Sequence, residues 1–234
     1  TELASRIRSK SLSPVEILNT FLERIESVNP MINAIVTLAD DAIERAQQAE
    51  TAIMHGEIWG PLHRVPFTIK DSIDTMGIKT TRGSRLFESH VPKNDATVVR
   101  RLKDAGGILL GKTNLPEFAL WWETDNLVFG RTENPWKMGL TPGGSSGGEA
   151  AAIASGLSPL GVGSDLGGSI RVPAHYCGIV GLKATHGRVP LTGHWPDTLL
   201  RFMHVGPMAR TVRDIALGIS VMSGADGFDH YSVH

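Results

Sequence analysis

The pattern of apolar and polar positions predicts two helices near the start of the chain. Residues 13–29 read SPVEILNTFLERIESVN, and their apolar residues recur every three or four positions, as on one face of a helix. Ser13 and Glu16 form the capping box that commonly begins a helix. Residues 39–54, followed by Gly56, predict a second helix. The apolar face of each helix must pack against a larger body.

Further along the chain, short apolar runs alternate with helical patterns. Runs rich in Ile, Val and Leu are typical of buried strands. They occupy residues 65–70, 106–111, 158–165 and 179–185. Helical patterns cover residues 95–106 and residues 211–224, where Thr211 and Asp214 form another capping pair. The alternation predicts an α/β fold, with a mixed β-sheet core covered by α-helices on both faces.

Composition narrows the classes of function. Lysine plus arginine number 23 against 24 aspartates and glutamates, so no strong field would attract nucleic acid or an anionic membrane. No apolar run reaches the length of a membrane span, and the first ten residues lack the apolar segment of a signal peptide. The single cysteine, Cys177, excludes an intrachain disulfide and is typical of a reducing compartment. We therefore expect a cytoplasmic protein that binds neither nucleic acid nor membrane.

Two short glycine motifs suggest activities that their surroundings do not favour. GGILLGKT (106–113) matches the phosphate-loop pattern, but its middle reads as the strand itself, which favours a plain buried strand. GSSGG (144–148) matches the nucleophile elbow of α/β-hydrolases, with Ser146 as the nucleophile. The elbow follows a strand, whereas GLTPGG precedes this motif and is rich in residues that interrupt strands. The elbow therefore remains only an alternative.

A third interpretation takes the serines of GGSSGG (143–148) and GGSIR (167–171) together. A serine hydroxyl needs a neighbouring base to become a nucleophile, and a buried neutral lysine can replace the usual histidine. Lys70 ends the predicted strand at 65–70, where strand alternation directs Lys70 and Asp71 to opposite faces. On its own, however, a lysine at a strand end is usually a surface residue.

One long stretch carries a family resemblance. TPGGSSGGEAAAIASGLSPLGVGSDLGGSIRVPAHYCGIVGLKATHGRVP (141–190) resembles the amidase signature family, and GPMARTVRDIALGISVMSG resembles the family segment that follows it. The resemblance implies a single amidase signature domain over residues 1–234, with its signature core at 141–190. Family members are considerably longer, so we expect this sequence to hold the N-terminal and central portions of that fold.

The resemblance also implies the site. By analogy with the family, Ser169 is the nucleophile, Lys70 is the base, and Ser145 is the relay between them, in a Ser-cisSer-Lys triad whose relay serine follows a cis peptide. Glycines in DLGGS allow successive N–H groups to point toward one oxyanion. The expected oxyanion hole consists of the amides of Leu166, Gly167, Gly168 and Ser169.

Several neighbouring residues have expected supporting roles. We expect Ser146, Asp165 and Arg171 to hold the loops by hydrogen bonds, and a solvated ion pair is the alternative for Arg171. Trp121 and Trp122 could line an acyl pocket, but paired tryptophans more often pack in a core or at a rim.

The expected function is that of an amidase, which hydrolyses a linear, non-peptide carboxylic amide through a serine acyl-enzyme. The alternatives are the ammonia-releasing subunit of a tRNA-dependent amidotransferase and a noncatalytic family member. No cofactor is implied, and the nine histidines form no H-E-x-x-H or comparable metal motif. The expected partner is a small-molecule amide, and association with further copies of the chain is left open.

Overall fold

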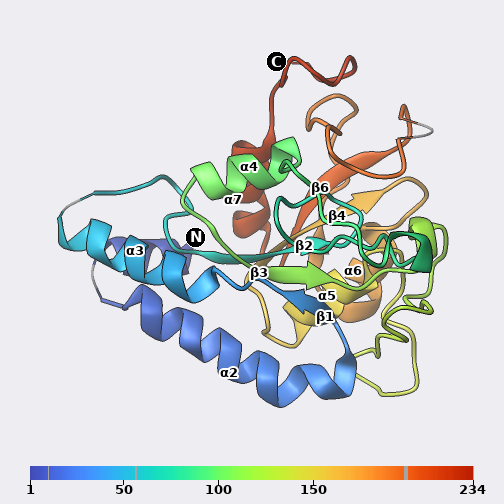
Figure 1. Ribbon diagram of the computed structural model, residues 1–234, viewed down its shortest axis with the longest axis horizontal. Helices are drawn as coiled ribbons and strands as arrows, with labels where there is room; N and C mark the ends of the chain where they lie inside the picture. The colour runs from blue at the N-terminus through green and yellow to red at the C-terminus, as the bar shows by residue number, and fades with distance from the viewer. Residues whose placement is uncertain (10, 56, 198–199, 234) are drawn as a thin grey trace.

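A six-stranded mixed sheet forms the centre of the fold (Figure 1). The computed structural model describes residues 1–9, 11–55, 57–197 and 200–233. Over these residues the helices are α1 Glu2–Arg8, α2 Pro14–Ile32, α3 Ala42–Met54, α4 Thr97–Asp104, α5 Gly147–Ala154, α6 Arg171–Cys177 and α7 Val212–Met222. The strands are β1 Ile35–Leu38, β2 Pro66–Lys70, β3 Ile108–Thr113, β4 Leu160–Asp165, β5 Val180–Gly181 and β6 His204–Ala209.

The order of the strands places the predicted lysine at a functional edge. The sheet runs β1-β3-β2-β4-β6-β5, in which β2 pairs in parallel with both β3 and β4 while the outer pairs are antiparallel. Neighbouring parallel strands end at the same edge, where ligands commonly bind in open α/β sheets. Lys70 is the last residue of β2 and Asp165 is the last residue of β4, so both lie at this edge.

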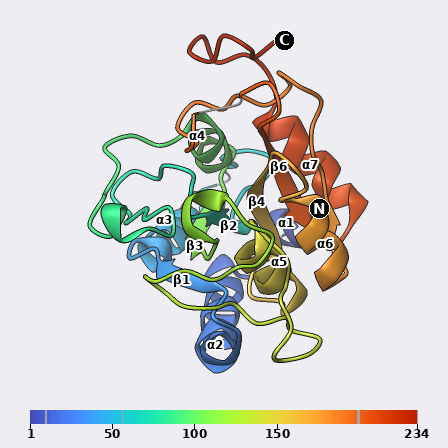
Figure 2. The same ribbon diagram turned by 90° about the vertical axis from the view of Figure 1, so that its right-hand side faces the viewer.

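Helices cover both faces of the sheet, as the sequence predicts. Figures 1 and 2 show α4 and α7 on one side of the sheet and α2 and α5 on the other. The core strands β2, β3 and β4 are buried at every position. Burial on both faces explains why these strands read as short apolar runs instead of alternating patterns. None of the described helices is long and apolar enough to cross a membrane.

The first long helix confirms its predicted start and extends past its predicted end. The Glu16 amide donates to the Ser13 hydroxyl at 3.3 Å, which is the expected cap. The helix continues through Pro30 to Ile32, whose side chain is buried, and ends at Asn33 with a left-handed φ of 50°. Gly56, expected to close the second helix, lies outside the described residues.

One central strand and one small cluster were not predicted. Strand β6 contains Gly206 and Pro207, residues that usually interrupt strands, yet it pairs with both β4 and β5. Beside it, Cys177 at the end of α6 packs with Ile170 and Met208 in a separate apolar cluster. Burial raises the pKa of the Cys177 thiol to about 12.

Candidate active site

Lys70 is completely buried at the end of β2 and points to two hydroxyl groups. Its Nζ donates to Ser145 Oγ at 2.6 Å and to Ser164 Oγ at 3.0 Å. Burial lowers the pKa of Lys70 to about 7, against the opposing effects of Asp165 and Glu149, because desolvation disfavours an ammonium ion. A lysine with this pKa is partly neutral near pH 7 and can accept a proton.

The relay serine lies in the loop that leads into α5. The peptide bond between Gly144 and Ser145 is cis, and Ser145 is fully buried. Ser164 was not among the expected site residues. It precedes Asp165 in β4, and the small polar residue inside this apolar strand was the available signal.

The loop that carries Ser169 is tied directly to the relay loop. The Ser146 amide donates to the Ser169 carbonyl at 3.1 Å, which brings the two serine segments together. Ser169 is 8% exposed, and no described residue forms a hydrogen bond with its hydroxyl. The hydroxyl can therefore meet a substrate, but a direct contact between Ser145 and Ser169 is not part of this arrangement.

The nucleophile elbow with Ser146 does not fit the structure. Ser146 is fully buried, and its hydroxyl lies 3.3 Å from both the amide and the carbonyl of Ser164. No strand leads into Ser146 among the described residues, and this serine caps α5 instead. It holds the relay loop against β4 and does not face a substrate.

One member of the expected oxyanion hole is already occupied. The Gly168 amide donates to Asp165 Oδ1 at 2.8 Å, so it cannot also point at a substrate oxygen, and including it in the hole was wrong. No described backbone group accepts from the amides of Leu166, Gly167 and Ser169. These three amides remain the candidates.

Asp165 shapes this loop. Its carboxylate accepts hydrogen bonds from the amides of Gly168, Ile170 and Arg171 and from the Arg171 guanidinium, and Lys183 lies 3.4 Å away. Burial alone would raise the pKa of Asp165, but these hydrogen bonds outweigh it and hold the pKa well below its usual range. The charged carboxylate thus fixes the turn between β4 and α6.

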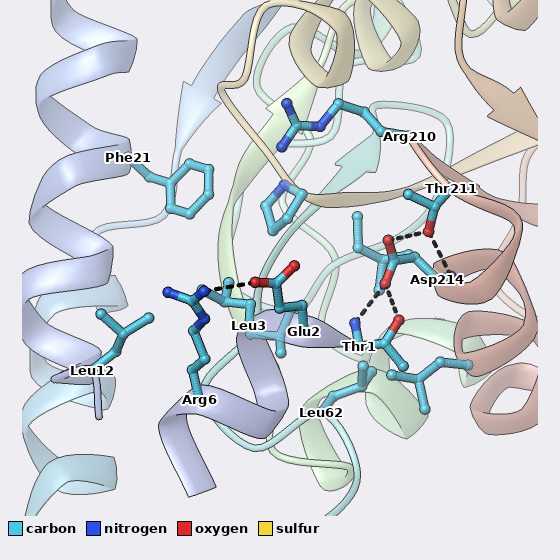
Figure 3. A pocket seen from close by; sticks show the side chains of 14 residues that line it. Thr1, Glu2, Leu3, Arg6, Leu12, Phe21, Leu62, Arg210, Thr211 and Asp214 are labelled. Carbon is cyan, nitrogen blue, oxygen red and sulfur yellow. Dashed lines mark hydrogen bonds and ion pairs between the residues drawn. The ribbon is translucent and has the colours of Figure 1, made fainter. Parts of the chain in front are cut away.

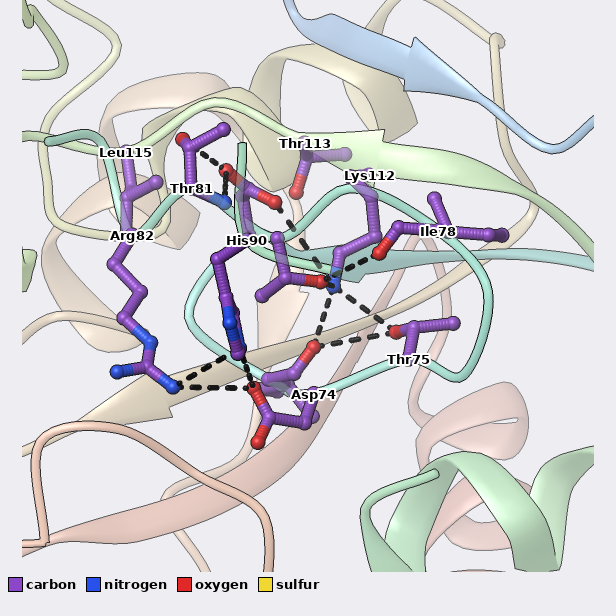
Figure 4. A network of polar contacts seen from close by, with 12 residues as sticks. Asp74, Thr75, Ile78, Thr81, Arg82, His90, Lys112, Thr113 and Leu115 are labelled. Atoms are coloured by element: carbon purple, nitrogen blue, oxygen red, sulfur yellow. Dashed lines mark hydrogen bonds and ion pairs between the residues drawn. The ribbon is translucent and has the colours of Figure 1, made fainter. Parts of the chain in front are cut away.

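A second buried lysine, which no sequence pattern indicated, orders the segment after Lys70 (Figure 4). Lys112 Nζ donates to the Ile73 carbonyl and to the hydroxyls of Thr75 and Thr80, at 3.0 and 3.1 Å for the hydroxyls. It lies 4.0 Å from Asp71 Oδ1, and both side chains are fully buried. Burial lowers the pKa of Lys112 to about 8 and raises that of Asp71 to about 6. This network holds the loop beside the base and is not itself in contact with Ser145.

The cavity in Figure 3 lies at the other end of the sheet. Its volume is about 430 Å³, and its walls include Val65, just before β2, and Leu160, the first residue of β4. Neither Lys70 nor a signature serine lines it. Arg6 in its wall is paired with Glu2 at 3.0 Å. The cavity is therefore separate from the candidate active site.

The tryptophan pair lies at the rim of the site and not in the core. Trp121 and Trp122 are 64% and 55% exposed. The Trp122 indole donates to the Gly167 carbonyl at 3.4 Å, a long contact that places the ring against the oxyanion loop. An apolar surface thus adjoins the loop that carries Ser169.

Comparison with known proteins agrees with this geometry. A sequence profile of the amidase family matches residues 16–234. The A-type component of a glutamyl-tRNA(Gln) amidotransferase from a Sulfurihydrogenibium species is 46% identical over 236 residues, covering 99% of this chain and 48% of that protein. An acylamidase from Rhodococcus erythropolis is 45% identical and covers 100% of this chain and 49% of that protein.

A solved structure extends the likeness to the fold. A bacterial aryl acylamidase described as an amidase signature enzyme superposes with a TM-score of 0.92 at 36% identity, covering 99% of this chain and 48% of that one. The chain spans about half the length of the relatives it matches. The profile match and the shared fold show that this chain belongs to the amidase signature family.

Proposed function

We propose that this chain carries the catalytic centre of an amidase that hydrolyses linear carboxylic amides through a serine acyl-enzyme. The observation that carries the proposal is the buried Lys70, whose Nζ lies 2.6 Å from Ser145 Oγ and whose pKa is lowered by burial to about 7. Such a group can act as a base near neutral pH. Ser169, on the loop tied to Ser146, is the proposed nucleophile.

The proposed reaction proceeds by acyl transfer. Ser169 attacks the amide carbonyl while its proton passes to Ser145, which gives its own proton to neutral Lys70. The amides of Leu166, Gly167 and Ser169 stabilise the oxyanion that forms. The lysine proton returns through Ser145 to the leaving nitrogen, and the amine departs. Water then hydrolyses the ester by the same relay and regenerates the free serine.

A covalent label tests the nucleophile. We expect a fluorophosphonate to modify Ser169 and no other serine, because only a serine activated by a base reacts readily. Mass spectrometry of the digested protein locates the label, and Ser169→Ala is the control that should abolish it. Label on Ser146 or on a distant serine would contradict the proposed nucleophile.

A second candidate follows from one of the relatives. The similarity to a component of a glutamyl-tRNA(Gln) amidotransferase, at 46% identity, supports a role in releasing ammonia from glutamine for transfer by partner chains. The two functions share the proposed triad and differ in their partners. Size-exclusion chromatography of the natural protein from its own cells distinguishes them, because only the amidotransferase component should elute with stable partner chains and show glutaminase activity.

A further inference from the structure

Glu149 is a carboxyl side chain enclosed between α5 and the sheet. It belongs to the first turn of α5, one helical turn after Ser145, and has no exposed surface. Thr68 Oγ1 donates to Glu149 Oε1, and Thr113 Oγ1 donates to Oε2 at 2.8 Å. Glutamate is rarely buried completely, and each carboxyl oxygen here has its own hydroxyl donor.

The strands beneath this carboxyl are shaped to receive it. A Cβ added to Gly161 in β4 would lie 1.9 Å from Glu149 Oε1, so only glycine fits beneath the carboxyl. Gly161 pairs with Thr68, and Thr113 lies on the other side of β2. Three adjacent strands therefore contribute a hydroxyl, a hydroxyl and an empty space to one carboxyl group.

The same arrangement brings the carboxyl close to the proposed base. Thr68 and Lys70 are two residues apart in β2 and so point to the same face, and Lys70 is paired with Thr113 across the sheet. The Glu149 carboxyl, bound between the two threonines, lies on this face beside Lys70. Two ionisable groups are thus buried together in a site where the charge of one affects the other strongly.

We propose that Glu149 is a positioning residue for the base, and that its carboxyl shares one proton with Lys70 and thereby decides whether the lysine is neutral. The proposal rests on the proposed function. With one proton between them, the pair is either an ammonium with a carboxylate or an amine with a carboxylic acid. In the second form the proton has left Nζ and is bound to a carboxyl oxygen of Glu149. Only this form, or the fully deprotonated pair, provides a base for Ser145.

The electrostatics of the site support such sharing. Burial raises the pKa of Glu149 to about 7, against the hydrogen bonds of its two threonines, and burial lowers the pKa of Lys70 to about the same value. The pair therefore titrates as a unit, with steps that belong to both groups. The other charged or titratable groups that act on one member of the pair are Lys112, Asp165 and His194. Lys112 is held by its own network, and Asp165 is held by Arg171 and Lys183.

Glu149→Gln tests the inference without a known substrate. The side chain keeps its shape but can no longer carry the negative charge that favours protonated Lys70. We measure the second-order rate of Ser169 labelling by a fluorophosphonate from pH 5 to pH 9. We expect the acid limb to become a single step whose midpoint is lower than in the wild type by on the order of one pH unit. At pH 5.5 the rate, relative to its own alkaline plateau, should rise by roughly tenfold.

Two further variants make the test decisive. Glu26→Gln removes an exposed carboxylate from α2 and should leave the midpoint unchanged. Thr113→Val keeps the charge but removes a hydrogen bond that favours the carboxylate, so the midpoint should move in the same direction by a smaller amount. It also provides the test if Glu149→Gln does not fold.

The inference and the proposed function fail in different ways. If the variants label more slowly at every pH with an unchanged midpoint, Glu149 has only a structural role and the inference is overturned while the nucleophile stands. If wild-type Ser169 takes no label at any pH, the proposed function is overturned, and the inference falls with it.

Discussion

At the scale of single residues, burial decides the chemistry of the site. Lys70 combines a position at a strand end, complete burial and two hydroxyl partners, Ser145 and Ser164. The sequence indicated Lys70 and the two signature serines through the family resemblance. Ser164 and Glu149 reach the site only because strands distant in sequence become neighbours, so no local pattern identified them.

The proposed triad makes graded losses of activity the expected outcome. Ser169→Ala should abolish acyl transfer, and Lys70→Ala should lower kcat by roughly 10²–10⁴-fold because it removes the general base. Ser145→Ala should retain some activity, since a water molecule can partly replace the relay hydroxyl. The double variant should lose no more than Lys70→Ala alone, because the residues act as a unit. Full activity in Ser145→Ala would remove this serine from the mechanism.

The pKa of Lys70 predicts an acid limb in the pH profile. Catalysis needs the neutral amine, and burial lowers the pKa to about 7, so activity should fall as the pH drops below about 7. Measurement of kcat/KM from pH 5 to pH 9 should show this inflection in the wild type and not in Lys70→Ala. An inflection that survives in Lys70→Ala and disappears on replacing His175 would identify a histidine as the base.

At the scale of elements, the strands that carry the site were predictable and one of their neighbours was not. The apolar runs at 65–70 and 158–165 became β2 and β4, because strands buried on both faces are uniformly apolar. Strand β6 lies beside β4, but its Gly206–Pro207 pair gives a turn signal. Its pairing depends on β4 and β5, which lie elsewhere in the sequence.

The Asp71–Lys112 network should stabilise the segment that follows β2. Lys112→Met leaves the buried Asp71 carboxyl without its cation and should lower the free energy of unfolding by about 3–5 kcal/mol, measured by urea denaturation. Adding Asp71→Asn should recover part of this loss, because no buried charge then remains. A double variant less stable than Lys112→Met would show that the pair is not coupled.

At the scale of the whole molecule, one edge of the sheet gathers the loops of the candidate site while a cavity opens at the other. The loop between β4 and α6 joins the two halves of the signature core, and Asp165 connects its ends through backbone amides. The family resemblance predicted the architecture, because the glycine pattern is long. It did not predict which amides are occupied, since the Gly168 contact depends on the folded turn.

Asp165 should make the molecule sensitive to acid. Its folded pKa is held below the unfolded value of about 3.9, so its contribution to stability is present above that pH and is lost as the pH falls through the folded pKa. Asp165→Asn should lower the free energy of unfolding by about 2 kcal/mol or more at pH 7. Urea denaturation between pH 5 and pH 2.5 should show this difference shrinking. A difference that does not depend on pH would mean that the carboxylate charge is not what stabilises the loop.

The enclosed thiol of α6 has a practical consequence for labelling this protein. Cys177 is the single cysteine of the sequence, it has no exposed surface, and burial raises its pKa to about 12. Maleimides and iodoacetamides react with accessible thiolates, so the native fold should be inert to them. A cysteine introduced at an exposed position would then be the single reactive thiol. Fluorophores, spin labels or surface attachment can therefore be directed to one chosen position without first replacing the native residue.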